Sequence, residues 1–498
     1  MSNLSKSPRF LSSAVGLFLA VLFSVAPVRA QEPWTRVATK NFEMYTTNDA
    51  AHATAALAAF ERVRSFFLQS DQATSVPEGQ VKIVAFRSEA EYAQYRLNPG
   101  AFAYFLHNHK HDYIVMRDIN PEHFPAVIHE YTHLVIQHSG WKLPLWMNEG
   151  VAEVYSSLQT QGNQMVLGQL PVGRMNDLRN GTMLDLGTLM AVDHSSPYYQ
   201  QRDKMRLFYA ESWALSHMLM LSPEYKSKFL NFVAAISAGK PSAECFQQIY
   251  GKTLEQVQGD LVASLNVAAQ QTELLNVKAA AGDVQPVISP LSNFDRDLTL
   301  ADLLSASTRT AGVARTMLLQ LSAEQPGNAD VEESLGYLAW QQGDEREAQV
   351  HFRRAFQNGS NDPVMLCEYA SLVEASEQGD IQEGDAARAA LLKALAIRPD
   401  YTDARLQFAL MEFRAGRYQA ASTNFGQIKK VKPEQAYCFY SALAFTQFKL
   451  GRTEEARAAA TSAQHFANSP QRQERCLSLL TQLDSSRRRP EALSSLLP

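Results

Sequence analysis

The chain has 498 residues, of which 46% are hydrophobic and 19% charged, and its formal net charge at pH 7 is −5. This length predicts more than one domain, and the composition agrees with a soluble protein that builds full cores. The negative net charge argues against a nucleic-acid-binding surface. Four cysteines are too few for a disulfide scaffold, and Cys438 and Cys476 could either pair or remain separate buried thiols.

Residues 1–30 have the pattern of a secretory signal peptide. Lys6 and Arg9 supply the positive start, Leu11–Val25 is an apolar core too short for a membrane span, and Val28–Ala30 is a small-residue cleavage site. We therefore expect export, to the periplasm or outside the cell, and a mature chain without a propeptide. No later stretch reaches the length of a transmembrane helix, so the mature chain is expected to lack an integral membrane segment.

Between residues 31 and 276, short β-type runs mix with longer segments of helical periodicity, which predicts an α+β domain. Strands are expected at Trp34–Thr46, at Val81–Phe86 and on either side of residues 107–111. Helices are expected at Ala51–Gln69, Ser88–Arg96, Pro125–His138, Pro144–Leu158, Lys204–Leu221, Glu224–Ala238 and Leu254–Leu274.

Three histidines, His107, His109 and His111, stand at alternate positions. On a strand they would share one face and could bind a metal ion. The alternative is the tip of a β-hairpin between Ala101–Leu106 and Tyr113–Arg117. Polar residues between two β-type runs mark turns, which favours the hairpin.

A second histidine motif begins at His129. On a helix, His129 and His133 lie one turn apart on one face and can hold one zinc ion. Glu130 sits one position round, where its carboxylate can reach a water on that zinc. Glu149 offers a third, anionic ligand and leaves a fourth position open, as in catalytic zinc sites. Glu153 is either a carboxylate that accepts the outer N–H of a ligand histidine or a solvated acid.

The motif, followed by Asn148, Glu149 and Glu153, resembles the gluzincin metallopeptidases, and most of all the peptidase MA-like domain of exported bacterial proteins. The resemblance implies a zincin-like α+β fold over residues 31–276. It also implies that Zn²⁺ is held by the two histidines and Glu149, and that Glu130 serves as general base and acid in peptide-bond hydrolysis. Such domains are often fused to helical repeats.

Hydrolysis of a peptide also needs a hydrogen-bond donor for the oxyanion that develops. Tyr209 is the candidate, because a tyrosine followed by a small-residue helix resembles a segment of peptidase MA-like domains. His217, two turns further along, is the rival donor. Both side chains could instead be packing residues whose polar tips are satisfied.

Residues 277–294 predict a linker, because prolines and small polar residues gather there. After it, five alanines recur at spacings of 34, 39, 34 and 35 residues, namely Ala314, Ala348, Ala387, Ala421 and Ala456. Glycines precede three of these alanines by five residues, at Gly343, Gly416 and Gly451. The longer step predicts an insertion at Glu377–Gly384.

This pattern resembles the tetratricopeptide (TPR) repeat, in which paired helices cross closely at small residues. About five repeats are expected over residues 295–484, stacked as an all-α solenoid with a concave face for protein partners, and a tail over 485–498. The alternative is a plain helical bundle.

The sequence is compatible with three functions. The first is an exported zinc peptidase whose repeats bind a substrate or partner protein. The second is a TPR-based scaffold with a peptidase-like domain of low activity. The third is a zinc amide hydrolase acting on cell-wall peptide.

Overall fold

The computed structural model describes residues 33–69, 80–97, 101–108, 110–162, 164–268, 271–277, 286–375 and 381–488. The expected signal peptide and all but the first residues of the expected tail lie outside this part of the chain, as does His109. Within it, no helix is long and apolar enough to cross a membrane.

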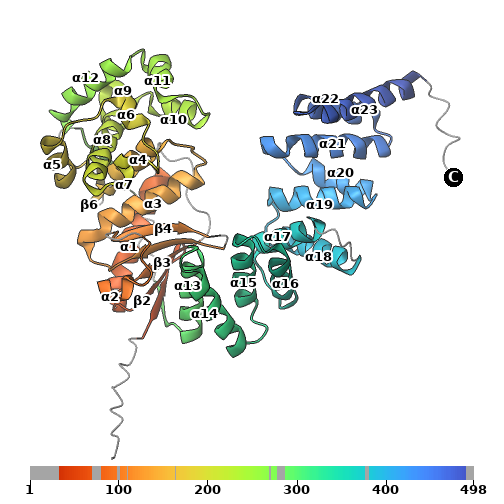
Figure 1. The fold of residues 1–498 in the computed structure, drawn as a ribbon, viewed down its shortest axis with the longest axis horizontal. Coiled ribbons are helices and arrows are strands. Elements are labelled where there is room, and N and C mark those ends of the chain that lie inside the picture. Colours follow the sequence, from red (N-terminus) through yellow and green to blue (C-terminus); the bar gives the residue numbers. More distant parts are fainter. Residues whose placement is uncertain are drawn as a thin grey trace, which may run out of the picture. The chain divides into compact units, whose positions relative to one another are not determined.

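A six-stranded mixed sheet forms the centre of the N-terminal region (Figure 1). The strand order is β4 (Ala103–His107), β5 (Asp112–Met116), β3 (Val81–Ala85), β2 (Phe42–Thr46), β1 (Thr35–Ala38) and β9 (Val287–Pro290). The three inner strands β2, β3 and β5 run parallel, whereas β1, β4 and β9 are antiparallel to their neighbours. Strand β4 therefore forms one edge of the sheet.

Both faces of the sheet are covered, because successive side chains of a strand point to opposite faces. Ile83 and Ile114 are opposite each other in register and belong to the main core. Val84 and Val115, the next pair, belong to a second core on the other face. All four side chains are fully buried, which explains why apolar residues occupy consecutive positions in β3 and β5.

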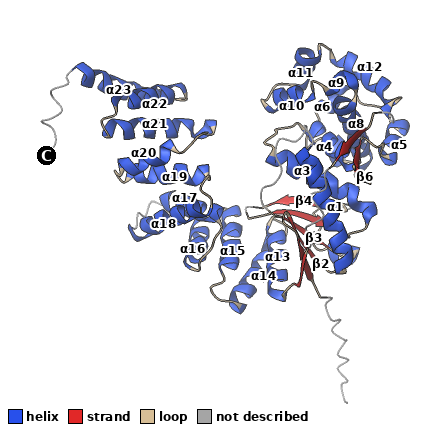
Figure 2. Cartoon of the chain, turned by 180° about the vertical axis from the view of Figure 1, so that it is seen from behind, coloured by secondary structure: helices blue, strands red, loops and turns tan. Residues whose placement is uncertain are grey.

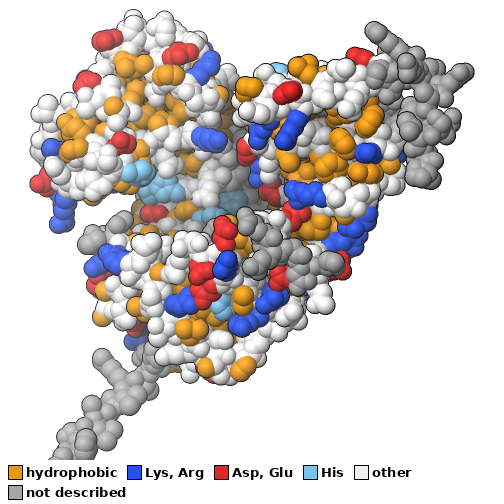
Figure 3. Space-filling model, turned by 45° about the vertical axis from the view of Figure 1, so that its right-hand side comes forward, with side chains coloured by type: hydrophobic (Ala, Val, Ile, Leu, Met, Phe, Trp, Pro, Cys, Tyr) orange, Lys and Arg blue, Asp and Glu red, His pale blue; other side chains and the backbone are white. Residues whose placement is uncertain are grey.

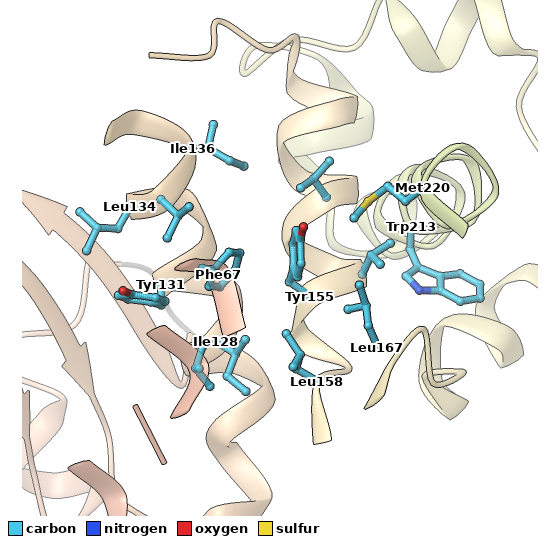
Figure 4. Close-up of a cluster of buried hydrophobic side chains, with 14 of the residues drawn as sticks. Phe67, Ile128, Tyr131, Leu134, Ile136, Tyr155, Leu158, Leu167, Trp213 and Met220 are labelled. Carbon is cyan, nitrogen blue, oxygen red and sulfur yellow. The ribbon is translucent and has the colours of Figure 1, made fainter. Parts of the chain in front are cut away.

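Long helices build the main core. They are α1 (Ala50–Gln69), α3 (Phe124–His138), α4 (Leu145–Ser156) and α8 (Arg202–Leu221). Phe67 of α1 lies between two tyrosines, with ring centroids 5.8 Å from Tyr131 of α3 and 4.7 Å from Tyr155 of α4, and Trp213 of α8 continues the cluster (Figure 4). A Cβ atom at Gly150 of α4 would overlap the backbone oxygen of Ser212 of α8, so only glycine permits this helix contact.

The remaining elements of this region are short. Before α3 the chain forms the helix α2 (Glu89–Tyr92) and the 3₁₀ turn η1 (Pro121–His123). The helical part after α4 contains α5 (Val172–Asn180), α6 (Leu186–Met190), α7 (Pro197–Gln200), α9 (Pro223–Lys226), α10 (Phe229–Ser237), α11 (Ser242–Cys245), the π-helical turn η2 (Phe246–Tyr250) and α12 (Leu254–Leu265). A small antiparallel sheet is formed by β6 (Gln159–Gln161), β7 (Gln164–Leu167) and β8 (Glu273–Asn276).

Four predictions need correction. The helix expected at Ser88–Arg96 is the shorter α2, which spans only Glu89–Tyr92. The expected helix Leu254–Leu274 ends at Leu265, because the following residues lead into β8, which pairs with β7. The expected helix Glu224–Ala238 is two helices, α9 and α10. The expected linker 277–294 contains β9, whose pairing with β1 extends the large sheet. Figure 2 shows strands β2, β3 and β4 of this sheet in red among the blue helices.

Helix pairs follow the sheet region, and the two helices of each pair pack against each other. The pairs are α13 (Asn293–Ser305) with α14 (Ala311–Glu324), α15 (Ala329–Gln341) with α16 (Glu345–Gln357), α17 (Pro363–Ala375) with α18 (Ile381–Ile397), α19 (Thr402–Arg414) with α20 (Tyr418–Gly426), and α21 (Pro433–Lys449) with α22 (Thr453–His465), after which α23 spans Pro470–Arg488. The region is thus helical and TPR-like.

The repeat positions behave as their spacing predicts. All five recurring alanines lie on the second helix of a pair and are 0% exposed. Gly343, Gly416 and Gly451 have positive φ angles of 80°, 73° and 72°, so each turns the chain between paired helices in a conformation that favours glycine. The insertion expected at Glu377–Gly384 lies partly outside the described residues, and α18 already begins at Ile381.

Candidate metal centre

Helix α3 presents two faces with different chemistry. Pro125 occupies its first turn, where the missing N–H costs nothing. Val127, Tyr131 and Leu134 are buried against the core, as the apolar spacing predicts. The other face lines a cleft of about 1250 Å³, whose polar side chains include His129, Glu130 and His133 of α3, Glu149 and Glu153 of α4, and Arg174, Tyr199 and Tyr209.

The structure brings His129, His133 and Glu149 together with a geometry that fits a single metal ion. The Nε2 atoms of the two histidines are 3.0 Å apart, and Oε2 of Glu149 lies 3.3 Å from His129 Nε2 and 3.5 Å from His133 Nε2. Tetrahedral zinc with bonds of about 2.0–2.1 Å would separate its ligand atoms by roughly 3.3–3.4 Å. Within the described residues this is the one group of at least three potential ligands whose atoms converge in this way.

The electrostatics of the three side chains also favour a cation. Glu149 Oε2 is buried and makes no hydrogen bond. Burial lowers the pKa of His129, but the nearby carboxylates of Glu149, Glu153 and Glu130 outweigh burial and raise it to about 9. Burial raises the pKa of Glu149, but His129 and His133 outweigh it and hold that pKa far below its usual range. Glu149 thus stays ionised, and the carboxylates around His129 favour a positive charge at this place.

Each predicted histidine ligand has a partner on its outer nitrogen. His129 Nδ1 lies 3.5 Å from Oε1 of Glu153, and His133 Nδ1 lies 3.4 Å from Oδ1 of Asn148. Glu153 is buried and accepts two hydrogen bonds from Arg174, at 2.6 and 2.9 Å. This arrangement agrees with the predicted supporting role of Glu153 and not with a solvated acid. Arg174, on α5, was not identified from the sequence.

Replacing Arg174 by methionine is expected to weaken zinc binding by about 10–100-fold. The change leaves the Glu153 carboxylate buried without its guanidinium partner, so it no longer fixes the ring of His129 in place. Competition with a chromophoric chelator measures the zinc affinity. Arg179→Met is the control, because Arg179 is an exposed arginine of the same helix and lies away from the cleft. Equal affinities in the two variants would contradict this role.

Glu130 lies between the metal group and the sheet. Its Oε2 accepts a hydrogen bond of 2.9 Å from the backbone N–H of Phe105, on the edge strand β4. This bond holds the carboxylate in the cleft that the three converging side chains also line, and Glu130 is not a member of the converging group. The general-base role of Glu130 remains a prediction.

The two predicted oxyanion donors occupy different environments. Tyr209 lines the cleft, with its ring centroid 6.4 Å from that of His129, and burial raises its pKa so that the phenol keeps its proton. His217 is buried, and its Nε2 lies 3.2 Å from the backbone oxygen of Gly168, outside the cleft lining. A second tyrosine, Tyr199 of α7, was missed; its hydroxyl lies 3.5 Å from Oε1 of Glu149.

The alternating histidines follow the hairpin interpretation. Strands β4 and β5 pair antiparallel from Ala103↔Met116 to His107↔Asp112. Asp112 contacts His107 at 2.6 Å and His138, the last residue of α3, at 2.8 Å. His111 is half-buried, and burial together with the positive charges of Lys82 and Lys110 lowers its pKa to about 2. The described histidines of this cluster form no metal-binding group.

Asp112 makes stability depend on pH. Burial raises its pKa, but the hydrogen bonds from His107 and His138 outweigh burial and lower it to about 2, from 3.8. Because the folded pKa is below the unfolded one, the stabilisation is present above about pH 4 and is lost as the pH falls towards 2. Asp112→Asn should therefore lower the free energy of unfolding by about 2 kcal/mol at pH 6, and by much less at pH 2.5. Urea titrations of this variant and of the exposed control Asp400→Asn measure the difference.

The four cysteines are all free. Cys438 and Cys476 line one pocket between α21 and α23 but form no bond, and Cys438 is exposed, so neither a bridge nor two buried thiols describes them.

The known proteins that resemble this chain include solved structures of TPR proteins. No protein-family model and no curated protein matches the chain. Among solved structures, YrrB, described as a TPR protein with an unusual peptide-binding site, is 16% identical over 36% of this chain and 90% of its own, with a TM-score of 0.31. MamA is 17% identical over 41% of this chain and 99% of its own, with a TM-score of 0.29. TTC0263, a thermophilic TPR protein of Thermus thermophilus, is 18% identical over 39% of this chain and 98% of its own, with a TM-score of 0.22.

These matches cover between 36% and 41% of the chain and concern its TPR-like region. The assignment of the metal centre therefore depends on the positions of its own side chains.

Proposed function

We propose that the sheet domain is a zinc-dependent peptidase and that the repeats bind a protein substrate or partner. The observation that carries the proposal is the convergence of His129, His133 and Glu149, with Glu130 held by Phe105 in the same cleft. Two imidazoles and one carboxylate are the protein ligands of a catalytic zinc site that keeps an open position.

Bound zinc would lower the pKa of a water to roughly 7 and polarise a carbonyl group. Glu130 takes the proton of the attacking water and later delivers it to the leaving amine. Tyr209, whose phenol stays protonated, donates a hydrogen bond to the oxygen that gains negative charge. Glu153 and Asn148 hold the rings of the two histidines in orientation.

The edge strand β4 supplies a place for the substrate backbone. Its inner edge pairs with β5, and its other edge faces the cleft, where Ala103, Tyr104 and Phe105 line the wall. An extended peptide can pair with such an edge as an added strand. The cleft then holds the peptide by its main chain beside Glu130.

The proposal is tested with the purified mature protein and a mixed peptide library. We expect one zinc ion per chain, cleavage of library peptides, loss of cleavage after treatment with a chelator, and recovery on adding Zn²⁺. The same centre could hydrolyse a cell-wall peptide, so isolated peptidoglycan peptides form a second substrate set. A protein that binds no zinc even when it is supplied would rule out this function.

Protein binding by the repeats is the second candidate function, and a pocket in the last repeats favours it. The pocket has a volume of about 540 Å³ and is lined by apolar side chains such as Phe413 and Phe445, three arginines and no carboxylate. Figure 3 shows hydrophobic side chains gathered on these repeats, with basic side chains among them. An acidic peptide segment with an apolar side chain fits this lining. If the biological activity of the protein survives Glu130→Gln unchanged, binding and not hydrolysis is the function.

A further inference from the structure

Two arginines of the cleft take no part in the metal centre. Arg202 and Arg206 lie one turn apart at the start of α8, and both line the cleft. Their side chains are exposed, and among the described residues neither makes a hydrogen bond or an ion pair. Arg174, by contrast, is taken up by Glu153.

These two arginines decide the charge of the cleft. The acidic groups that line it are Glu130, Glu149 and Glu153. Arg174 offsets Glu153, and a divalent cation at the metal centre offsets the other two. Arg202 and Arg206 are then the charges left over, and they make the cleft attractive to an anion.

The arrangement is unfavourable for the helix alone. Like charges four residues apart repel each other, and cations near the first turn oppose the helix dipole. An anion bound between the two guanidinium groups would relieve the repulsion. Guanidinium groups also match the planar, two-oxygen geometry of a carboxylate.

We infer that Arg202 and Arg206 form a subsite for a carboxylate of the peptide substrate, a specificity that rests on the proposed peptidase function. The carboxylate belongs either to an Asp or Glu side chain near the scissile bond or to the free C-terminus of the peptide. Both sources carry the same chemistry, and the subsite would recognise either within a cleft large enough for an extended segment.

The test measures binding separately from turnover. Zinc-loaded full-length Glu130→Gln is titrated with fluorescent peptides of one sequence in three forms: internal Glu with a C-terminal amide, internal Gln with an amide, and internal Gln with a free C-terminus. We expect at least one carboxylate form to bind roughly tenfold more tightly than the neutral form, by fluorescence anisotropy. The form that gains identifies the source of the carboxylate.

Adding Arg202→Ala and Arg206→Ala should abolish that preference, whereas Lys204→Ala should retain it. Lys204 is an exposed cation in the same helical turn that does not line the cleft. Equal binding of all three peptides, no binding of either carboxylate form, or a preference that survives the double change would overturn the inference. If the wild-type protein cleaves neutral peptides and shows no preference for acidic ones, the carboxylate subsite is wrong and the proposed peptidase function stands. If it binds acidic peptides preferentially but cleaves none, the subsite stands and the peptidase function is wrong.

Discussion

Glu130→Gln is expected to lower kcat for peptide cleavage by about 10²–10⁴-fold while the zinc content stays at one ion per chain. Glutamine keeps the size of the side chain and can still accept the hydrogen bond from Phe105, which Glu130 now accepts at 2.9 Å. It cannot take a proton from water at neutral pH. The loss should therefore fall on kcat, with little change in KM.

The control for Glu130→Gln is another Glu-to-Gln change at a position outside the cleft. Glu122→Gln serves, because Glu122 is an exposed acid just before α3 and does not line the cleft. Zinc is measured by atomic spectroscopy on the same samples, and initial rates are measured with a cleaved library peptide. A Glu130→Gln enzyme with wild-type kcat would remove the general-base role.

Glu149→Ala is expected to weaken zinc binding by more than about 100-fold. Loss of an outer partner of a ligand costs about 10–100-fold, and loss of a ligand that is itself charged should exceed that. The variant leaves two imidazoles with Nε2 atoms 3.0 Å apart as the remaining ligands and removes the one anionic ligand of the ion. Chelator competition measures the affinity, and activity should fall in parallel at limiting zinc.

Glu149 is buried, so the fold of the variant must be checked by circular dichroism and thermal unfolding. Glu149→Gln is a second variant that keeps the volume and an oxygen ligand but removes the charge. Its zinc affinity should lie between those of the wild type and of Glu149→Ala. Glu474→Ala, at an exposed position of α23, is the matched control. Zinc affinity unchanged in Glu149→Ala would remove Glu149 from the ligand set.

The part of the site within one helical turn was predictable from the sequence. His129 and His133 share a face because four residues make about one turn, and the same rule relates Glu149 to Glu153. That Glu149 would meet the two histidines from the next helix was inferred from its ligand chemistry and from the resemblance, because no periodicity relates residues of two helices. Arg174 and Tyr199 were missed because they reach the site from α5 and α7, and no local periodicity marks a residue that contacts a site far away in sequence.

The fold, too, has elements that local periodicity predicts and elements that it does not. The long helices and the apolar inner strands have strong periodic signals, and they are present close to the expected positions. Strands β6 to β9 were missed because three of them are exposed and four residues or fewer give little alternation to detect. What makes these segments strands is pairing with distant partners. The repeats were predictable because the same small residue is required at each helix crossing.

The pairing of β9 with β1 has a consequence for the order of folding. Thr35 lies opposite Pro290, so the sheet beneath the candidate metal centre cannot be complete until the chain beyond residue 290 has emerged. Until then β1 presents an unpaired edge, which invites association with other chains. A truncated protein that stops at residue 276 lacks β9 and is therefore expected to aggregate, so a stable form of the sheet region must extend at least to residue 290.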